Sequence, residues 1–133
     1  EFQLRITNIN SLMNEAVSYD AERVETVKTR LRTALDELKV NVDENRFEQE
    51  LIFYLEKYDI TEEKVRLGNH LNYFLETLNG TEANGRKLGF ITQEMGREIN
   101  TMGSKSNHSE MQKLVVMMKD ELEKIKEQVL NVL

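Results

Sequence analysis

Two glutamates four residues apart, Glu94 and Glu98, lie in the most distinctive stretch of the sequence. On a helix this spacing places both carboxylates on one border, one turn apart. Two such carboxylates could jointly hold a hard divalent cation through their oxygen atoms. The same spacing is routine on solvated helix faces, where Arg97 would pair with Glu94 at i,i+3. Residue chemistry alone therefore leaves open both a metal-binding pair and an ordinary charged face.

A second group with chemical potential combines a carboxylate, a cation and a titratable ring, at Glu63, Arg66 and His70. Their spacings of three and four residues put them on one stripe of a helix. Histidine changes its protonation near neutral pH and could act as a general acid or base, with Glu63 orienting the ring. A polar histidine beside the core is the structural alternative. The two groups converge only if this stripe faces Glu94 and Glu98, and helical periodicity does not fix which helices meet.

The net charge of −6 argues against nucleic-acid binding over the whole surface, but the charge is unevenly distributed. Residues 85–109 form a basic island with four basic and two acidic side chains. Arginine offers a bidentate fork for phosphate, and asparagine can bind a base edge or a ribose hydroxyl. The candidates for such contacts in this island are Arg86, Lys87, Arg97, Asn100 and Lys105. The alternative is a solvated face whose charges pair with one another.

Three glycines seven residues apart, Gly89, Gly96 and Gly103, run along the other border of the same helix. A glycine inside a helix costs about 1 kcal/mol relative to alanine, so this stripe needs an explanation. We expect close approach of another backbone, from a neighbouring helix or a polynucleotide; an irregular helix is the alternative. Gly103 is also a plausible stop for the helix.

The elements that must position these residues are all predicted to be helical. The sequence contains no proline and shows no strand-like alternation, and apolar residues recur every three or four positions. This periodicity predicts helices over residues 4–17, 24–38, 47–58, 61–78, 86–102 and 111–132. Asp20, Thr61 and the pair Ser109 and Gln112 are expected to cap helix starts. The absence of cysteine excludes disulfides, thiolate ligands and a cysteine nucleophile.

The predicted fold class is all-α, an elongated helical bundle ending in a long antiparallel helical hairpin. We divide the chain into a bundle arm over residues 1–84 and a signature helix with a coiled-coil-like helix over 85–133. Residues 79–85 have loop chemistry. No apolar run reaches the roughly 20 residues of a membrane span, and no signal-peptide pattern opens the chain, so we expect no membrane partner and a cytoplasmic location. We interpret the whole chain as the C-terminal region of a longer protein.

Residues 85–106 read GRKLGFITQEMGREINTMGSKS, which resembles the signature of the YicC/YloC family. Residues 46–51, 59–63 and 119–131, with Arg66, Leu67 and His70, are also similar to that family. The resemblance implies a bacterial, cytosolic, homo-oligomeric, metal-dependent endoribonuclease that acts on RNA. It also implies a protein of about twice this length, whose N-terminal half would be a partner of this chain. Gly89 and Gly96 depart from the family pattern, which has aspartate and asparagine there, so neither is taken as a site.

The residues that match the family pattern are assigned roles as hypotheses. The catalytic candidates are His70, Glu94 and Glu98. The candidates for RNA binding are Arg66, Arg86, Lys87, Arg97, Asn100 and Lys105. The candidate ligands for a divalent ion, Mg²⁺ or Mn²⁺, are Glu50, Glu63, Glu94 and Glu98. The rival hypothesis is a non-catalytic helical scaffold for oligomerisation or RNA binding.

Overall fold

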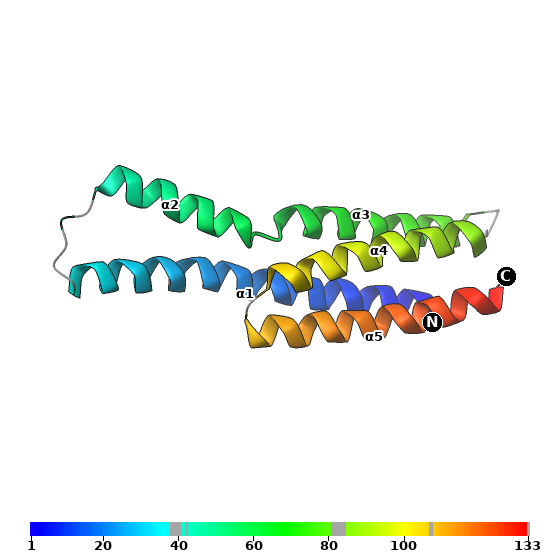
Figure 1. Cartoon of the computed structure of the whole chain (residues 1–133). Coiled ribbons are helices and arrows are strands. Elements are labelled where there is room, and N and C mark those ends of the chain that lie inside the picture. Colours follow the sequence, from blue (N-terminus) through cyan, green and yellow to red (C-terminus); the bar gives the residue numbers. More distant parts are fainter. Residues whose placement is uncertain (38–40, 42, 81–84, 107, 133) are drawn as a thin grey trace.

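A computed structural model describes residues 1–37, 41, 43–80, 85–106 and 108–132 and shows five α-helices in them (Figure 1). The helices are α1 (Phe2–Glu37), α2 (Glu44–Lys57), α3 (Thr61–Leu78), α4 (Gly85–Lys105) and α5 (Ser109–Val132). The described residues contain no strand, which confirms the all-α prediction. Residues 81–84, most of the predicted loop, lie outside the described part.

The helices form two regions of different thickness (Figure 1). The first half of α1 packs with α3, α4 and α5 as a four-helix bundle, and α4 and α5 form the predicted antiparallel hairpin. The second half of α1 extends beyond the bundle, with α2 alongside it (Figure 1). We call this extension, residues 20–37 with α2, the arm.

The first helix is continuous where the sequence suggested a break near residues 18–20. Asp20 does not cap a new helix; its Oδ1 accepts a hydrogen bond from Arg23 Nε at 3.0 Å, at i,i+3 within α1. The prediction of two helices was wrong because the segment contains no glycine or proline and its apolar rhythm continues without a change of phase. The chain therefore runs from the bundle into the arm as one continuous helix.

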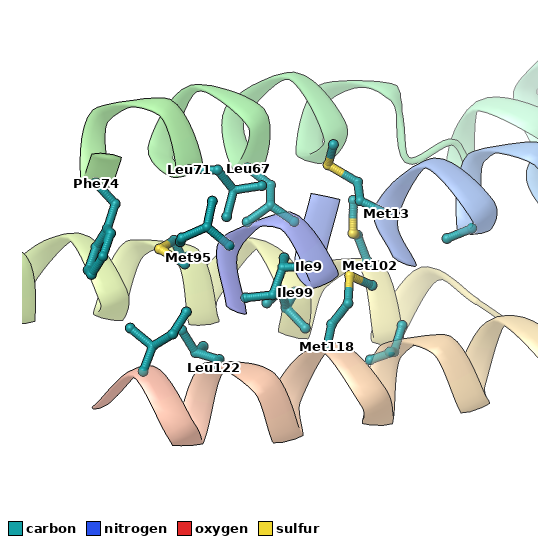
Figure 2. Packing of buried hydrophobic residues seen from close by; sticks show 14 of the residues in the cluster. Ile9, Met13, Leu67, Leu71, Phe74, Met95, Ile99, Met102, Met118 and Leu122 are labelled. Carbon is teal, nitrogen blue, oxygen red and sulfur yellow. The ribbon is translucent and has the colours of Figure 1, made fainter. Parts of the chain in front are cut away.

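The bundle encloses one core built from α1, α3, α4 and α5 (Figure 2). The predicted inner face of α4 is buried, at Leu88, Ile91, Met95, Ile99 and Met102. The predicted seam of α5 is buried as well, at Met111, Leu114, Met118, Leu122, Ile125 and Val129; the side chain of Val132 lies outside the described part. Both helices were therefore oriented correctly by their periodicity.

The glycine stripe of α4 is covered by α5. A Cβ atom added to Gly89 would lie 3.9 Å from a methyl of Val129, one on Gly96 3.3 Å from a methyl of Leu122, and one on Gly103 3.1 Å from a methyl of Val115. Both series step by seven residues in opposite directions, as antiparallel helices require. The predicted close approach is therefore real, but the neighbour is a row of α5 side chains and not a backbone or a polynucleotide.

The arm is held by polar contacts more than by a core. Arg32 on α1 donates two hydrogen bonds, of 2.8 and 2.7 Å, to the carboxylate of Glu44 on α2, and its guanidinium lies 4.2 Å from the ring centroid of Phe47. Ile52 and Phe53 of α2 are exposed, Phe53 to 71%. Among the described residues, α2 contributes none to the bundle core.

The ends of α3 and α4 differ from expectation in ways that shape the site. Ile60 occupies the N-cap position of α3 without a side-chain hydrogen bond, so Thr61 is not the cap. Asp59, one residue earlier, accepts hydrogen bonds on its Oδ1 from the backbone N–H and the hydroxyl of Thr61. The expected stop at Gly103 does not occur, because α5 packs over this turn and α4 continues to Lys105. The extra turn brings Lys105 beside the start of α3.

The start of α5 also differs from the predicted capping box. His108 Nδ1 accepts a hydrogen bond from the backbone N–H of Glu110 at 3.2 Å. The side chain of Gln112 donates to the carbonyl groups of Gly103 and Ser106 instead of reaching back to Ser109. His108 therefore caps α5 with its side chain.

Candidate functional site

Arg66 on α3 is the centre of a charged network that joins α3 to α4. Its Nε donates a hydrogen bond of 2.9 Å to Glu98 Oε1 on α4. Its other guanidinium nitrogens lie 3.3 Å from a carboxylate oxygen of Glu62 and 3.7 Å from one of Glu63. Hydrogen bonds to Glu98 and then Glu62 raise the pKa of Arg66 above its ordinary value. The Arg66 guanidinium thus pairs with three carboxylates at once.

Lys105 completes this network from the last turn of α4. Its ammonium group donates to Glu63 Oε1 at 2.5 Å and to the backbone carbonyl of Asp59 at 2.9 Å. The side chain of Glu63 is only 2% exposed, and its Oε2 is buried without a hydrogen-bond partner. Glu98 is 9% exposed. Two of the predicted metal ligands are therefore buried carboxylates that cations already neutralise.

The Arg66–Glu98 contact shows that the α3 stripe faces the α4 border, the packing that periodicity left open. In antiparallel helices, one turn forward on one helix and one turn back on the other reaches the next facing pair. This register places His70 level with Glu94. His70 is half-buried, and no hydrogen bond or ion pair of its ring is found among the described residues. Glu94 lies 3.8 Å from Arg97 in a loose ion pair.

Glu50 lies apart from the other candidate ligands. It is exposed on α2, where it lines a hollow of the arm with Phe47 and Tyr54. Within the described ranges, no three histidine, aspartate or glutamate side chains come close enough to bind one metal ion. The four predicted ligands are therefore not gathered around one point in the described part of the chain.

The predicted RNA-binding residues fall into two sets. Arg66 and Lys105 belong to the internal network. Those exposed on the outer side of α4 are Arg86, Lys87, Arg97 and Asn100. The ammonium group of Lys87 lies 4.9 Å from the ring centroid of Tyr73 on α3.

Phe90, which was not predicted as a site residue, lies 62% exposed on this outer side of α4. Exposed aromatic rings are the surfaces on which single-stranded bases stack. The signal that could have found it is a large apolar residue at an outward position of the helix.

A cleft of about 350 Å³ between α1, α2 and the connection from α4 to α5 was also not predicted from the sequence. Its walls include Tyr19, Arg23, Arg30, Tyr54 and His108. These residues come from three separate segments, and each is unremarkable by itself in the sequence. No local spacing could have brought them together.

The fold and the network define an all-α domain in which a signature helix is held between α3 and α5. Residues 16–133 match the family described as "Endoribonuclease YicC-like, C-terminal", and the chain belongs to this family. No helix in the described ranges has both the length and the apolar character needed to cross a membrane.

Two curated relatives carry the name "Probable endoribonuclease YicC". The one from Clostridioides difficile (strain 630) is 38% identical over 135 residues, which cover 99% of this chain and 46% of the relative. The one from Haemophilus influenzae (strain ATCC 51907 / DSM 11121 / KW20 / Rd) is 36% identical over 104 residues, which cover 78% of this chain and 36% of the relative. The chain therefore spans less than half the length of these relatives.

Proposed function

We propose that the protein containing this chain is an endoribonuclease and that the α3–α4 face contributes part of its RNA-cleaving site. Membership of the family and the names of the two relatives support the activity. The observation that carries the location is the Arg66–Glu98 hydrogen bond, because its register places a titratable ring level with a carboxylate. The exposed basic side of α4 lies next to that position.

In this proposal the side chains divide the work of phosphodiester cleavage. The attacking oxygen must lose a proton, and the leaving oxygen must gain one. His70 is the general acid or base, and Glu94 orients its ring. Arg97 and Asn100 hold the RNA backbone and offset negative charge on the phosphorane. Glu98 acts through Arg66 and is a positioning residue.

We also propose that cleavage depends on a divalent ion, Mg²⁺ or Mn²⁺, as the family resemblance implies. The four glutamates do not converge in the described chain, so such an ion needs ligands from elsewhere in the full-length protein. The unpartnered Oε2 of Glu63 and the carboxylate of Glu94 are the groups that this chain could add.

The test is cleavage of labelled single-stranded RNA by the full-length protein, with and without Mg²⁺ or Mn²⁺. We expect His70→Ala to lower the cleavage rate by about 10²–10⁴-fold while RNA affinity stays within about threefold. Asn72→Ala, an exposed change on the same helix, is the matched control. Unchanged cleavage by His70→Ala would contradict the catalytic role, and a parallel loss of affinity and rate would make His70 a binding residue.

A second candidate function is an RNA-positioning scaffold, with all cleavage chemistry in the rest of the protein. The observation in its favour is that Glu63 and Glu98 are buried against cations rather than open to a substrate. Retardation of RNA by this chain without cleavage, and full cleavage by the His70→Ala full-length protein, would support the scaffold. Cleavage by this chain alone would exclude it.

We further propose that the protein self-associates through the arm. Ile52 and Phe53 are large apolar side chains open to solvent on α2, the helix with the least support from the core. Sedimentation should show an assembly larger than a monomer, and Phe53→Ser should reduce its mass. A compact monomer at micromolar concentration would remove this proposal.

A further inference from the structure

The cleft between α1, α2 and His108 has the size of a small-ligand site. Its volume of about 350 Å³ falls at the lower end of the range of roughly 300–1,000 Å³ for ligand pockets. Most of its lining residues belong to the arm. The family resemblance assigns no role to the side chains that shape it.

Arg23 is the strongest sign of a missing ligand. Its side chain is only 7% exposed. Nε donates to Asp20, and Nη2 lies 3.5 Å from the carbonyl oxygen of Leu55, but Nη1 is buried without a partner. A buried donor left unpaired is costly, and more so when the group is charged. Solvent does not reach Nη1 in this conformation, so an anion in the cleft would remove this cost once the guanidinium turns toward it.

A second cation reinforces the anion site. Arg30 lies two helical turns beyond Arg23 on α1 and lines the same cleft. Glu22 is the one carboxylate among the residues that line it, and Asp20, which pairs with Arg23, lies beside the lining.

Aromatic rings supply the remaining part of the site. Tyr19 and His108 stack with their centroids 5.6 Å apart, and both line the cleft. Tyr54 lines the opposite wall from α2. Nucleobases stack on such rings, because every base has a flat π face. Guanidinium groups and aromatic rings together match a ligand that has both phosphate and base.

We propose that this cleft binds a nucleoside phosphate, with the phosphate on the guanidinium groups of Arg30 and Arg23 and the base against the aromatic walls. The forked geometry of the guanidinium suits phosphate oxygens. The nucleotide is either the 5′-phosphorylated end of an RNA strand or a free mononucleotide. Only the first source rests on the proposed function.

The charges beside the cleft also interact with the charged network of Arg66 and Lys105. Burial raises the pKa of Asp20, the partner of Arg23, above its ordinary value, while Arg23 lowers it. The charge of Asp59 raises the same pKa more weakly, and the charge of Lys105 lowers it. Asp59 and Lys105 belong to the network that ends at Glu63. An anion bound beside Arg23 therefore adds a negative charge close to this network.

The test is calorimetric titration of the full-length protein with adenosine 5′-monophosphate, adenosine and inorganic phosphate. We expect the monophosphate to bind, adenosine to show no binding, and phosphate to bind more weakly than the nucleotide. Arg30→Gln should weaken binding of the monophosphate by at least about tenfold, the loss of one charge-assisted contact. Lys28→Gln is the matched control, because Lys28 is exposed on the same helix but does not line the cleft. Equal affinity of the two variants, or no binding of the monophosphate at millimolar concentration, would overturn the proposal.

Further variants and RNA ligands extend the test. Tyr54→Leu keeps an apolar wall but removes the ring, and should weaken the monophosphate more than inorganic phosphate. Tighter binding of a short RNA with a 5′-phosphate than of the same RNA with a 5′-hydroxyl assigns the site to a strand end. Equal binding of the two RNAs, with the monophosphate bound, assigns it to a free nucleotide. Loss of cleavage in His70→Ala leaves this result untouched, so the two proposals can fail separately.

Discussion

Arg66 on α3 and Glu98 on α4 are separated by 32 positions in the sequence, yet they share a hydrogen bond of 2.9 Å between facing helices. This contact fixes how the two helices slide past each other, and therefore which polar groups stand level. Lys105 and Glu63 hold the same interface from the end of α4. The network thus sets the geometry on which the proposed site depends.

Removing the central cation should destabilise the bundle. In Arg66→Met, Glu98 remains mostly buried and loses its cation, while Glu63 keeps Lys105. Breaking a buried pair is strongly destabilising, and because Arg66 is half exposed we expect a smaller but measurable loss of stability. Urea unfolding measures this change. Arg97→Met breaks an exposed pair and should stay within about 0.5 kcal/mol; equal effects of the two changes would contradict the central role of Arg66.

The glycine stripe predicts a graded response to alanine. Gly89→Ala meets Val129 at an ordinary contact distance and should gain up to about 1 kcal/mol from helix propensity. Gly103→Ala meets a methyl of Val115 at 3.1 Å, and valine is stiff, so stability should fall. Gly96→Ala should lie between them. Thermal unfolding gives the order, and a higher melting temperature for all three would show that α5 does not constrain the stripe.

A larger side chain at the middle glycine provides a second measurement. Gly96→Leu would force α4 and α5 apart at Leu122, and overpacking of this kind costs about 1–3 kcal/mol. Its melting temperature should fall below that of Gly96→Ala. Equal values would mean that α5 moves aside freely.

The contact between α1 and α5 should make stability depend on pH. Glu121 accepts hydrogen bonds of 3.2 Å from Arg5 and Asn8. Burial alone would raise its pKa, but hydrogen bonds from Asn8 and Arg5 outweigh burial and lower the pKa below its ordinary value. A carboxyl with a lowered folded pKa stabilises the fold above its ordinary pKa, and this contribution is lost as pH falls through the lowered value.

Glu121→Gln should therefore reduce the free energy of unfolding at pH 7 by about 1 kcal/mol, screened by solvent at this partly open site. The difference in the free energy of unfolding between Glu121→Gln and the original chain should shrink below about pH 4, as the carboxyl becomes protonated. Denaturant unfolding at pH 7 and pH 3 checks this. Glu123→Gln, at an exposed pair with Lys126, should show neither effect; a difference for Glu121→Gln that is constant with pH would contradict the assignment.

The basic side of α4 should govern the salt dependence of RNA binding. In the full-length protein, Arg97→Gln should reduce the slope of log affinity against log salt concentration by about 0.7, the value for one phosphate contact on a single strand. Lys126→Gln on α5 removes an equal charge from a helix outside the proposed site. Identical slopes for the two variants would place the RNA elsewhere.

The sequence predicted the packing faces well because periodicity carries that information. Met95 and Ile99 could be assigned to the core from their spacing with other apolar residues, and both are fully buried. Helix ends were predicted less well. Asp20 has the chemistry of a cap and also of an i,i+3 partner for Arg23, and only the continuous packing of α1 decides between them.

The candidate site could be predicted only in part. A helical wheel places Glu63 and Arg66 on one stripe, but it does not tell which helix faces that stripe. The Arg66–Glu98 contact depends on the tertiary fold, and so does the burial that leaves Glu63 against Lys105. The cleft around Arg23 was missed for the same reason, because its walls come from segments that are distant in the sequence.

The uninterrupted α1 has a mechanical consequence. Its 36 residues span about 54 Å at 1.5 Å per residue, and only the first half packs in the bundle core. A rotation of roughly 5° where the helix leaves the bundle displaces its far end, about 27 Å away, by about 2 Å. A force on the arm is therefore transmitted along one continuous helix, past the cleft at Arg23, to the contact between Arg5 and Glu121.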